Sequence, residues 1–170
     1  MRVWLTIGSL LTLAGPALAA PIDFECDVPP NRASSVDQSL PGPAVSMTGT
    51  LSIILARAGR FPASAGARLS SADGSTTLTL QLVGSGEAKD GTFAVTLTAK
   101  TPTATTRTPL GTLPAGAANI PFTLTVDATG AATATLAGWI HKAMLHPLTA
   151  PRARLFCSTG QFAFKGVEAR

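Results

Sequence analysis

The two cysteines constrain the fold more than any other feature of this chain. Cys26 and Cys157 stand near opposite ends of the 170-residue sequence, each in a segment of alternating apolar and polar residues. Ile22, Phe24 and Cys26 share one phase of the first segment, as expected of a half-buried β-strand. We therefore predict that the first and last segments are neighbouring terminal strands joined by a disulfide, with two buried free thiols as the alternative.

The last segment, residues 152–165, contains two such alternations separated by a Ser-Thr-Gly break. Leu155 and Cys157 precede the break, and Phe162 and Phe164 follow it. Because glycine is common in tight turns, we predict a turn at Gly160 within this terminal segment, with inward residues on both sides of it.

The first 19 residues are predicted to be a secretory signal peptide. Arg2 precedes a mostly apolar run, and Ala17-Leu18-Ala19 forms a small-x-small cleavage site. The apolar run is shorter than the about 20 residues that a spanning helix needs. We therefore predict one mature domain, 20–170, that is exported to the periplasm or cell exterior with no membrane span after signal cleavage. Oxidising compartments of this kind favour the disulfide.

The rest of the chain shows no sustained helical periodicity. Segments with a period of two alternate with Gly, Asp and Pro breaks, which is typical of many short strands in a sandwich. We predict an all-β fold, an antiparallel β-sandwich, with strands or strand arms at 45–57, 67–71, 76–83, 92–99 and 120–140. We expect loops at 29–43 and in the Thr- and Pro-rich stretch 100–119, the latter with one short strand near 110–113, and an ambiguous crossing at 141–151.

One hairpin carries a resemblance to a known family. Residues 120–138 alternate up to Val126-Asp127, turn at Gly130 and return to end at Gly138. This pattern resembles the penultimate hairpin of concanavalin A-like (laminin G-like) jelly-roll domains, and residues 158–168 resemble their closing strand. The resemblance implies a jelly-roll fold and no particular activity.

Acidic residues alternate along the first segment, where Asp23 and Glu25 project from one side. Jelly-roll glycoside hydrolases carry a similar strand of alternating acids, so this pair is the one catalytic possibility that we retain. Here Asp and Glu are interchanged and the segment lies at the mature N-terminus. We therefore expect Asp23 and Glu25 to form exposed cross-strand pairs with Arg152 and Arg154 instead.

Three residues are predicted to contact a ligand: Trp139, His141 and Arg107. Trp139 breaks the phase of its strand and lies close to His141, whereas Arg107 is the one reactive group in the stretch 100–119. In the alternative interpretation, Trp139 caps the edge of the core and the stretch is a solvated connector. His141 and His146 are the only histidines and no third ligand stands beside them, so we expect no metal and no other cofactor.

Charge and motifs guide the functional prediction. The 13 Lys and Arg residues are scattered along the sequence, which argues against nucleic acid as a partner. Nucleophile-elbow motifs are absent, so we lean against an enzyme. We predict an exported non-catalytic module, binding or structural, whose partner is a glycan or a cell-envelope protein. The alternatives are a small jelly-roll carbohydrate-active enzyme and a surface subunit that self-assembles by edge-strand addition.

Overall fold

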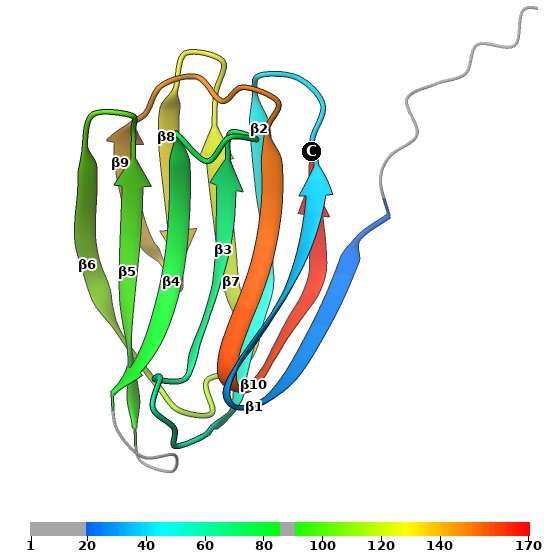
Figure 1. Ribbon diagram of the computed structural model, residues 1–170, viewed down its shortest axis with the longest axis vertical. Helices are drawn as coiled ribbons and strands as arrows, with labels where there is room; N and C mark the ends of the chain where they lie inside the picture. Colours follow the sequence, from blue (N-terminus) through cyan, green and yellow to red (C-terminus); the bar gives the residue numbers. More distant parts are fainter. Residues whose placement is uncertain (1–19, 86–90) are drawn as a thin grey trace, which may run out of the picture.

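The computed structural model describes residues 20–85 and 91–170; the predicted signal peptide, 1–19, lies outside them. These residues form an all-β structure whose strands pair antiparallel (Figure 1). This confirms the predicted fold class. The ten strands are β1 (Ile22–Ser39), β2 (Val45–Ala56), β3 (Ser64–Ser70), β4 (Thr77–Ser85), β5 (Thr92–Lys100), β6 (Thr105–Pro114), β7 (Ile120–Val126), β8 (Ala131–Leu136), β9 (Trp139–Met144) and β10 (Arg152–Ala169).

The strands form two packed layers that share their longest members. The pairing order is β6-β5-β4-β3-β10-β2-β7-β8-β9, with β1 also paired to β10. The first half of β10 pairs with β3, and its second half pairs with β2. We call the layer with β3 to β6 the front sheet and the layer with β2 and β7 to β9 the back sheet. β1 and β10 pass from one sheet to the other, so they hold the two layers together at one side (Figure 1).

A corner in the long strands makes this passage possible. Asn31 in β1 and Thr159 in β10 both have positive φ angles, of 65° and 50°. The Asn31 backbone N–H donates to the Thr159 hydroxyl at 3.2 Å, and the Asn31 side-chain carbonyl accepts from the Phe61 N–H at 3.2 Å. Two sequence predictions are therefore wrong: β10 bends at Gly160 without reversing, and β1 runs through most of the loop expected at 29–43.

The disulfide spans this corner. Cys26 lies in the part of β1 that belongs to the back sheet, whereas Cys157 lies in the part of β10 that belongs to the front sheet. They are bonded, with their Cα atoms 6.6 Å apart across a sequence separation of 131. The predicted bridge is confirmed, and it links one sheet to the other as well as the two ends of the chain.

Phe162 of β10 connects the two sheets through the core, and Phe164 packs within the back sheet. Phe162 packs edge-to-face on Phe93 of the front sheet, with ring centroids 5.9 Å apart, and Phe164 packs likewise on Phe122 of the back sheet at 6.2 Å. All four rings are buried. Edge-to-face pairs of this kind add about 0.5–1.5 kcal/mol each beyond the burial of apolar area.

Two further segments differ from the sequence predictions. The Thr- and Pro-rich stretch contains a full ten-residue strand, β6, which pairs with β5 along its whole length. The crossing expected at 141–151 begins with β9, which pairs with β8. Within the described ranges, no helix is long and apolar enough to cross a membrane.

Candidate functional site

The outward side chains of the front sheet line up in rows that cross the strands. The central row is set by the pairing registers and contains Asp37, Arg154, Arg68, Thr79, Thr98 and Arg107, one from each of β1, β10, β3, β4, β5 and β6. Because neighbouring strands lie about 4.8 Å apart, this row extends about 24 Å.

A groove of about 470 Å³ follows this row, its neighbouring row and the β3–β4 turn. Among the residues that the structure describes, its charged lining consists of five cations and two carboxylates: Arg68, Lys100, Arg107, Arg152 and Arg154, with Asp37 and Asp73. Five of the 13 basic residues of the chain thus line the groove together with only two of its nine acidic residues. The groove is strongly positive, although the bases that form it are scattered in the sequence.

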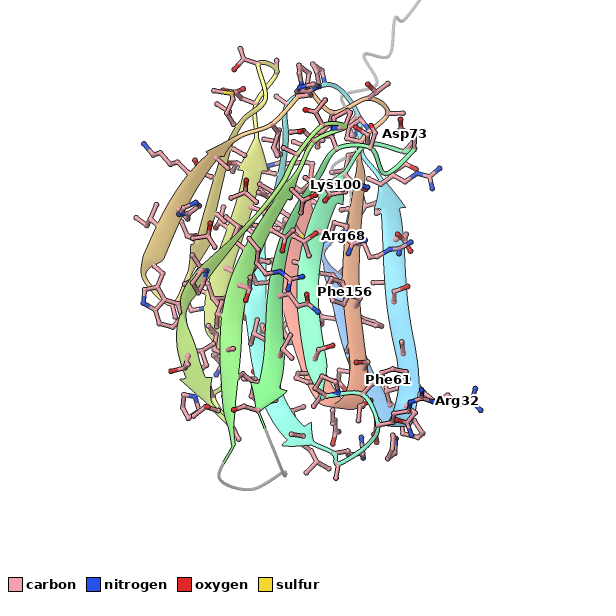
Figure 2. The ribbon with its side chains drawn as sticks, turned by 60° about the vertical axis from the view of Figure 1, so that its left-hand side comes forward. Arg32, Phe61, Arg68, Asp73, Lys100 and Phe156 are labelled. Atoms are coloured by element: carbon pink, nitrogen blue, oxygen red, sulfur yellow. A yellow bond between two sulfur atoms is a disulfide. The ribbon has the colours of Figure 1, made fainter. Side chains whose placement is uncertain are left out.

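Arg68 lies at the centre of the groove and is held on two sides. Its Nε donates to the Thr79 hydroxyl at 3.0 Å, and its guanidinium lies 5.6 Å from the centroid of the Phe156 ring. Burial, reinforced by the charge of Arg154, lowers the pKa of Arg68, which Asp37 opposes. Figure 2 shows Arg68 and Phe156 together on this face.

Gly66 makes room for the Phe156 ring. A Cβ at Gly66 would lie 2.6 Å from the ring atom Cζ and 2.4 Å from the Leu80 carbonyl oxygen. Any larger residue would therefore displace Phe156, and with it the surface on which Arg68 rests. This glycine shapes the groove by its small size.

Arg154 and Asp37 form an ion pair beside Arg68. The Arg154 Nε donates to Asp37 Oδ1 at 2.6 Å, and the two side chains remain 44% and 40% exposed. The carboxylate therefore stands at the solvent boundary, next to two guanidinium groups. It is well placed to contact a ligand that occupies the groove.

The β3–β4 turn closes the end of the groove at which Lys100 lies. Lys100 Nζ donates to the Gly74 carbonyl at 3.0 Å. Asp73 Oδ1 accepts from the Ser75 N–H at 3.0 Å and from its hydroxyl at 2.8 Å, and these bonds lower the pKa of Asp73. The turn is thus a fixed wall of the groove.

The charge arrangement does not serve the fold. Arg154 and Arg68 lie directly opposite each other on adjacent strands, and like charges in that position are destabilising by about 0.2–1 kcal/mol. The cations outnumber the carboxylates around them. A groove of this kind is suited to a ligand that brings its own negative charges.

The three residues predicted to contact a ligand lie in three different places. Arg107 lines the groove. Trp139 lies half-buried on β9, against the backbone of β6, where a Cβ at Gly111 would meet its ring at 2.5 Å. His141 lines a separate hollow of about 240 Å³ between β9 and the edge of β5 and β6. The structure therefore does not bring Trp139 and His141 together with Arg107.

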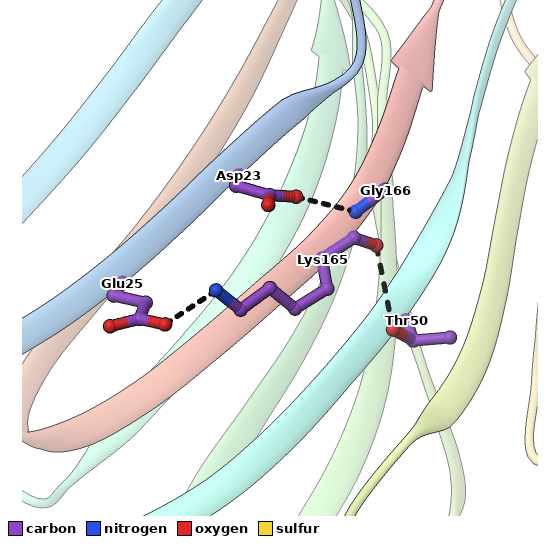
Figure 3. A network of polar contacts seen from close by, with 5 residues as sticks. All are labelled: Asp23, Glu25, Thr50, Lys165 and Gly166. Carbon is purple, nitrogen blue, oxygen red and sulfur yellow. Dashed lines mark hydrogen bonds and ion pairs between the residues drawn. The ribbon is translucent and has the colours of Figure 1, made fainter.

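Asp23 and Glu25 lie outside the groove, on the back-sheet half of β1 (Figure 3). Asp23 Oδ1 accepts from the Gly166 N–H at 2.8 Å, and Lys165 Nζ donates to Glu25, which raises the pKa of Lys165. The expected pairing of these acids with Arg152 and Arg154 is wrong. β1 continues beyond the corner, so a later residue, Asp37, meets Arg154.

Sequence reasoning missed four groove cations: Arg68, Lys100, Arg152 and Arg154. Each lies on the outward phase of its strand, opposite the phase of the leucines and valines in the core. That phase was a usable signal. The pairing of β10 with β3 was not foreseen, and without it the residues could not be placed in neighbouring rows.

The sequence matches no family model and no curated protein. Solved structures do match the fold. They include an alginate lyase from Alteromonas sp. 272 (TM-score 0.57, 11% identity, covering 75% of this chain and 71% of that one) and a polysaccharide lyase of family 18 (0.58, 11%, 75% and 71%). An alginate lyase from Pseudomonas aeruginosa also matches (0.57, 15%, 75% and 64%).

At these identities the likeness shows the fold alone, which is a β-sandwich of the jelly-roll type. It nevertheless corrects the functional prediction. The three structures named here are carbohydrate-active enzymes. The non-catalytic module predicted from the sequence is contradicted by this finding, and the alternative, a small jelly-roll carbohydrate-active enzyme, is the better supported.

Proposed function

We propose that this chain is a carbohydrate-active enzyme that binds an anionic polysaccharide in the front groove and cleaves it by β-elimination. The observation that carries the proposal is the row of unbalanced cations across the front sheet. A uronate polysaccharide, such as the alginate named for two of the fold neighbours, presents carboxylates at regular intervals. Arginines recognise such groups through paired hydrogen bonds.

The groove contains the groups that the reaction needs. Arg68 and Arg152 bind the carboxylate of one sugar and neutralise it, which makes the proton on the adjoining ring carbon more acidic. Asp37 accepts that proton. The electron pair forms a carbon–carbon double bond, the glycosidic bond at the next carbon breaks, and the leaving oxygen takes a proton from water.

The choice of Asp37 rests on its position. Both carboxylates that line the groove accept hydrogen bonds, Asp73 from its own turn and Asp37 from Arg154, but only Asp37 stands in the central row with Arg154 and Arg68. Neither histidine lines the groove, and the chain has no tyrosine. Asp37 is therefore the proton acceptor that the geometry favours.

Export of the protein is part of the same proposal. The predicted signal peptide at 1–19, the predicted single mature domain at 20–170 and the disulfide all support action on a polysaccharide outside the cytoplasm. We also propose that the jelly roll is of the concanavalin A-like class.

The test incubates the mature protein with alginate and follows the ultraviolet absorbance of the unsaturated sugar that elimination produces. Asp37→Asn is expected to lower turnover by at least about 100-fold, because a general base contributes about that much. Glu25→Gln is the matched control, since it weakens the equivalent pair between β1 and β10 outside the groove.

Three outcomes decide the proposal. Retention of the wild-type protein on a uronate polymer but not on a neutral glucan supports it. Absence of both unsaturated product and retention would refute it. Equal or tighter binding to single-stranded DNA would identify the groove as a nucleic-acid site instead.

A further inference from the structure

The groove continues past Arg68 along β10. A second hollow, of about 390 Å³, shares Arg68, Gln81 and Arg154 with it. A third, of about 360 Å³, shares Ser64, Gln81 and Ser158 with the second. Together the three hollows follow the first half of β10, about 20 Å from Arg152 to Ser158, and end at the corner.

Phe61 stands at this far end, on the segment between β2 and β3 (Figure 2). Its ring is 54% exposed and lines the third hollow together with Arg32. The Arg60 guanidinium lies 5.7 Å from the ring centroid. An exposed phenylalanine that contacts Arg60 and shares a hollow with Arg32 has no role in the core of the protein.

The backbone around Phe61 is fixed by the corner. Its N–H donates to the Asn31 side chain at 3.2 Å, and the Pro62 carbonyl accepts from the Ser158 hydroxyl at 3.4 Å. The ring is therefore presented by an anchored segment. No carboxylate is among the described residues that line the second and third hollows.

We infer that Phe61, Arg60 and Arg32 form a distal subsite for a further sugar of the same polyanionic chain; this inference rests on the proposed function. A flat aromatic ring packs on the apolar face of a sugar ring, and the arginines bind its carboxylate. Phe156 and Arg68 repeat this combination in the middle of the groove. The binding surface thus extends from Lys100 at one end to Phe61 at the other.

The test measures calorimetric affinities for uronate oligosaccharides of increasing length. The affinity of the wild-type protein rises once an oligosaccharide is long enough to reach Phe61. Phe61→Ala removes that rise, about two- to tenfold for long chains, and leaves short oligosaccharides unaffected. Ile140→Ala is the control, because Ile140 is 68% exposed but lies on β9, outside the three hollows.

The outcomes separate the two proposals. If Phe61→Ala keeps the full rise with length, or if the wild-type affinity does not depend on length, the distal subsite is refuted while the groove stands. If the wild-type protein binds no uronate of any length, the proposed function fails and the subsite fails with it. Phe61→Leu, which keeps apolar bulk without a ring, is expected to behave like Phe61→Ala.

Discussion

The two outer faces of the sandwich follow the same strand pattern but differ in charge. On the back face, threonines lie side by side across β2, β7 and β8: Thr48, Thr123 and Thr135 form one row. Charged groups at the β1 side of the back sheet are matched, as in the pairs Lys165–Glu25 and Arg57–Asp27. On the front face the corresponding rows carry five cations with two carboxylates.

This difference indicates that the fold does not require the excess of cations on the front face. Both faces cover the same apolar core, to which strands of both sheets contribute. The back face shows that threonine and matched pairs suffice. The excess of cations on the front face is therefore the feature on which the proposed ligand site rests, since departures from local consistency tend to mark functional sites.

The largest expected effect concerns the disulfide that links the two sheets. Replacing both cysteines, Cys26→Ser with Cys157→Ser, removes the covalent link between the sheets. The chain-entropy relation for a loop of this length gives a loss of about 5 kcal/mol in the free energy of unfolding. Urea unfolding with and without reductant measures it. A denaturation midpoint that does not change on reduction would contradict the role assigned to the bridge.

The next largest effect concerns binding. It compares two double variants that remove the same positive charge, one pair on the front face and one pair on the back sheet. Arg68→Gln with Arg107→Gln is expected to weaken binding to a uronate polymer by at least about tenfold, because each lost charge-assisted hydrogen bond contributes about 1.5–3 kcal/mol. Lys142→Gln with Lys165→Gln removes the same net charge from the back sheet and should leave binding unchanged. Equal losses in the two double variants would mean that overall charge, and not the groove, drives binding.

A smaller effect contrasts stability with binding. Arg68→Met keeps an aliphatic stem against Phe156 but removes a charge that faces Arg154. We expect the free energy of unfolding to change by less than about 1 kcal/mol, because relief of the repulsion from Arg154 offsets the lost hydrogen bond to Thr79, while polymer binding weakens. Lys165→Met on the back sheet removes the partner of Glu25 and should lower stability instead. Thermal unfolding of both variants measures the contrast, and an Arg68→Met variant destabilised by more than about 1 kcal/mol would show that the fold needs this arginine.

Local alternation was sufficient to predict β2 to β5, β7 and β8 with their inward residues, and the two cysteines of a chain predicted to be exported were sufficient to predict the bridge. Phe162 and Phe164 lie inward as their phase requires, and Cys157 meets Cys26. The corner was not predictable in the same way. Asn31 adopts a positive φ inside a segment rich in Pro and Ser, and such a segment reads locally as a loop.

The groove could not be predicted, because it depends on the order in which the strands pair, and local alternation does not show that order. The position of Arg154 opposite Arg68 requires β10 to pair with β3, two strands more than 80 residues apart in the sequence. Arg107 was identified on its own, but its distance from Arg154 is set by four strand pairings. Alternation shows which face of a strand a residue occupies, whereas strand order decides which residues become neighbours.

The smallest expected effect concerns the turns, where the two faces agree. Asp127 Oδ1, in the β7–β8 turn, accepts from the Thr129 hydroxyl and N–H at 2.7 and 2.8 Å, and these bonds lower its pKa. Asp73 in the β3–β4 turn is held in the same way. A carboxyl whose pKa is lower in the folded state adds stability above its ordinary pKa of 3.8, and that stability is lost as the pH falls further.

Asp127→Ala should therefore lower the Tm at neutral pH, and its difference from the wild-type protein should narrow as the pH is taken below 3.8. Asp73→Ala should show the same pH profile, because the bonds that hold the two carboxylates are alike. Thermal unfolding across this pH range measures both. A difference that stays constant with pH would show that these aspartates act through turn geometry and not through their charge. Agreement between the two variants would confine the contrast between the faces to the groove, where the ligand charges are expected.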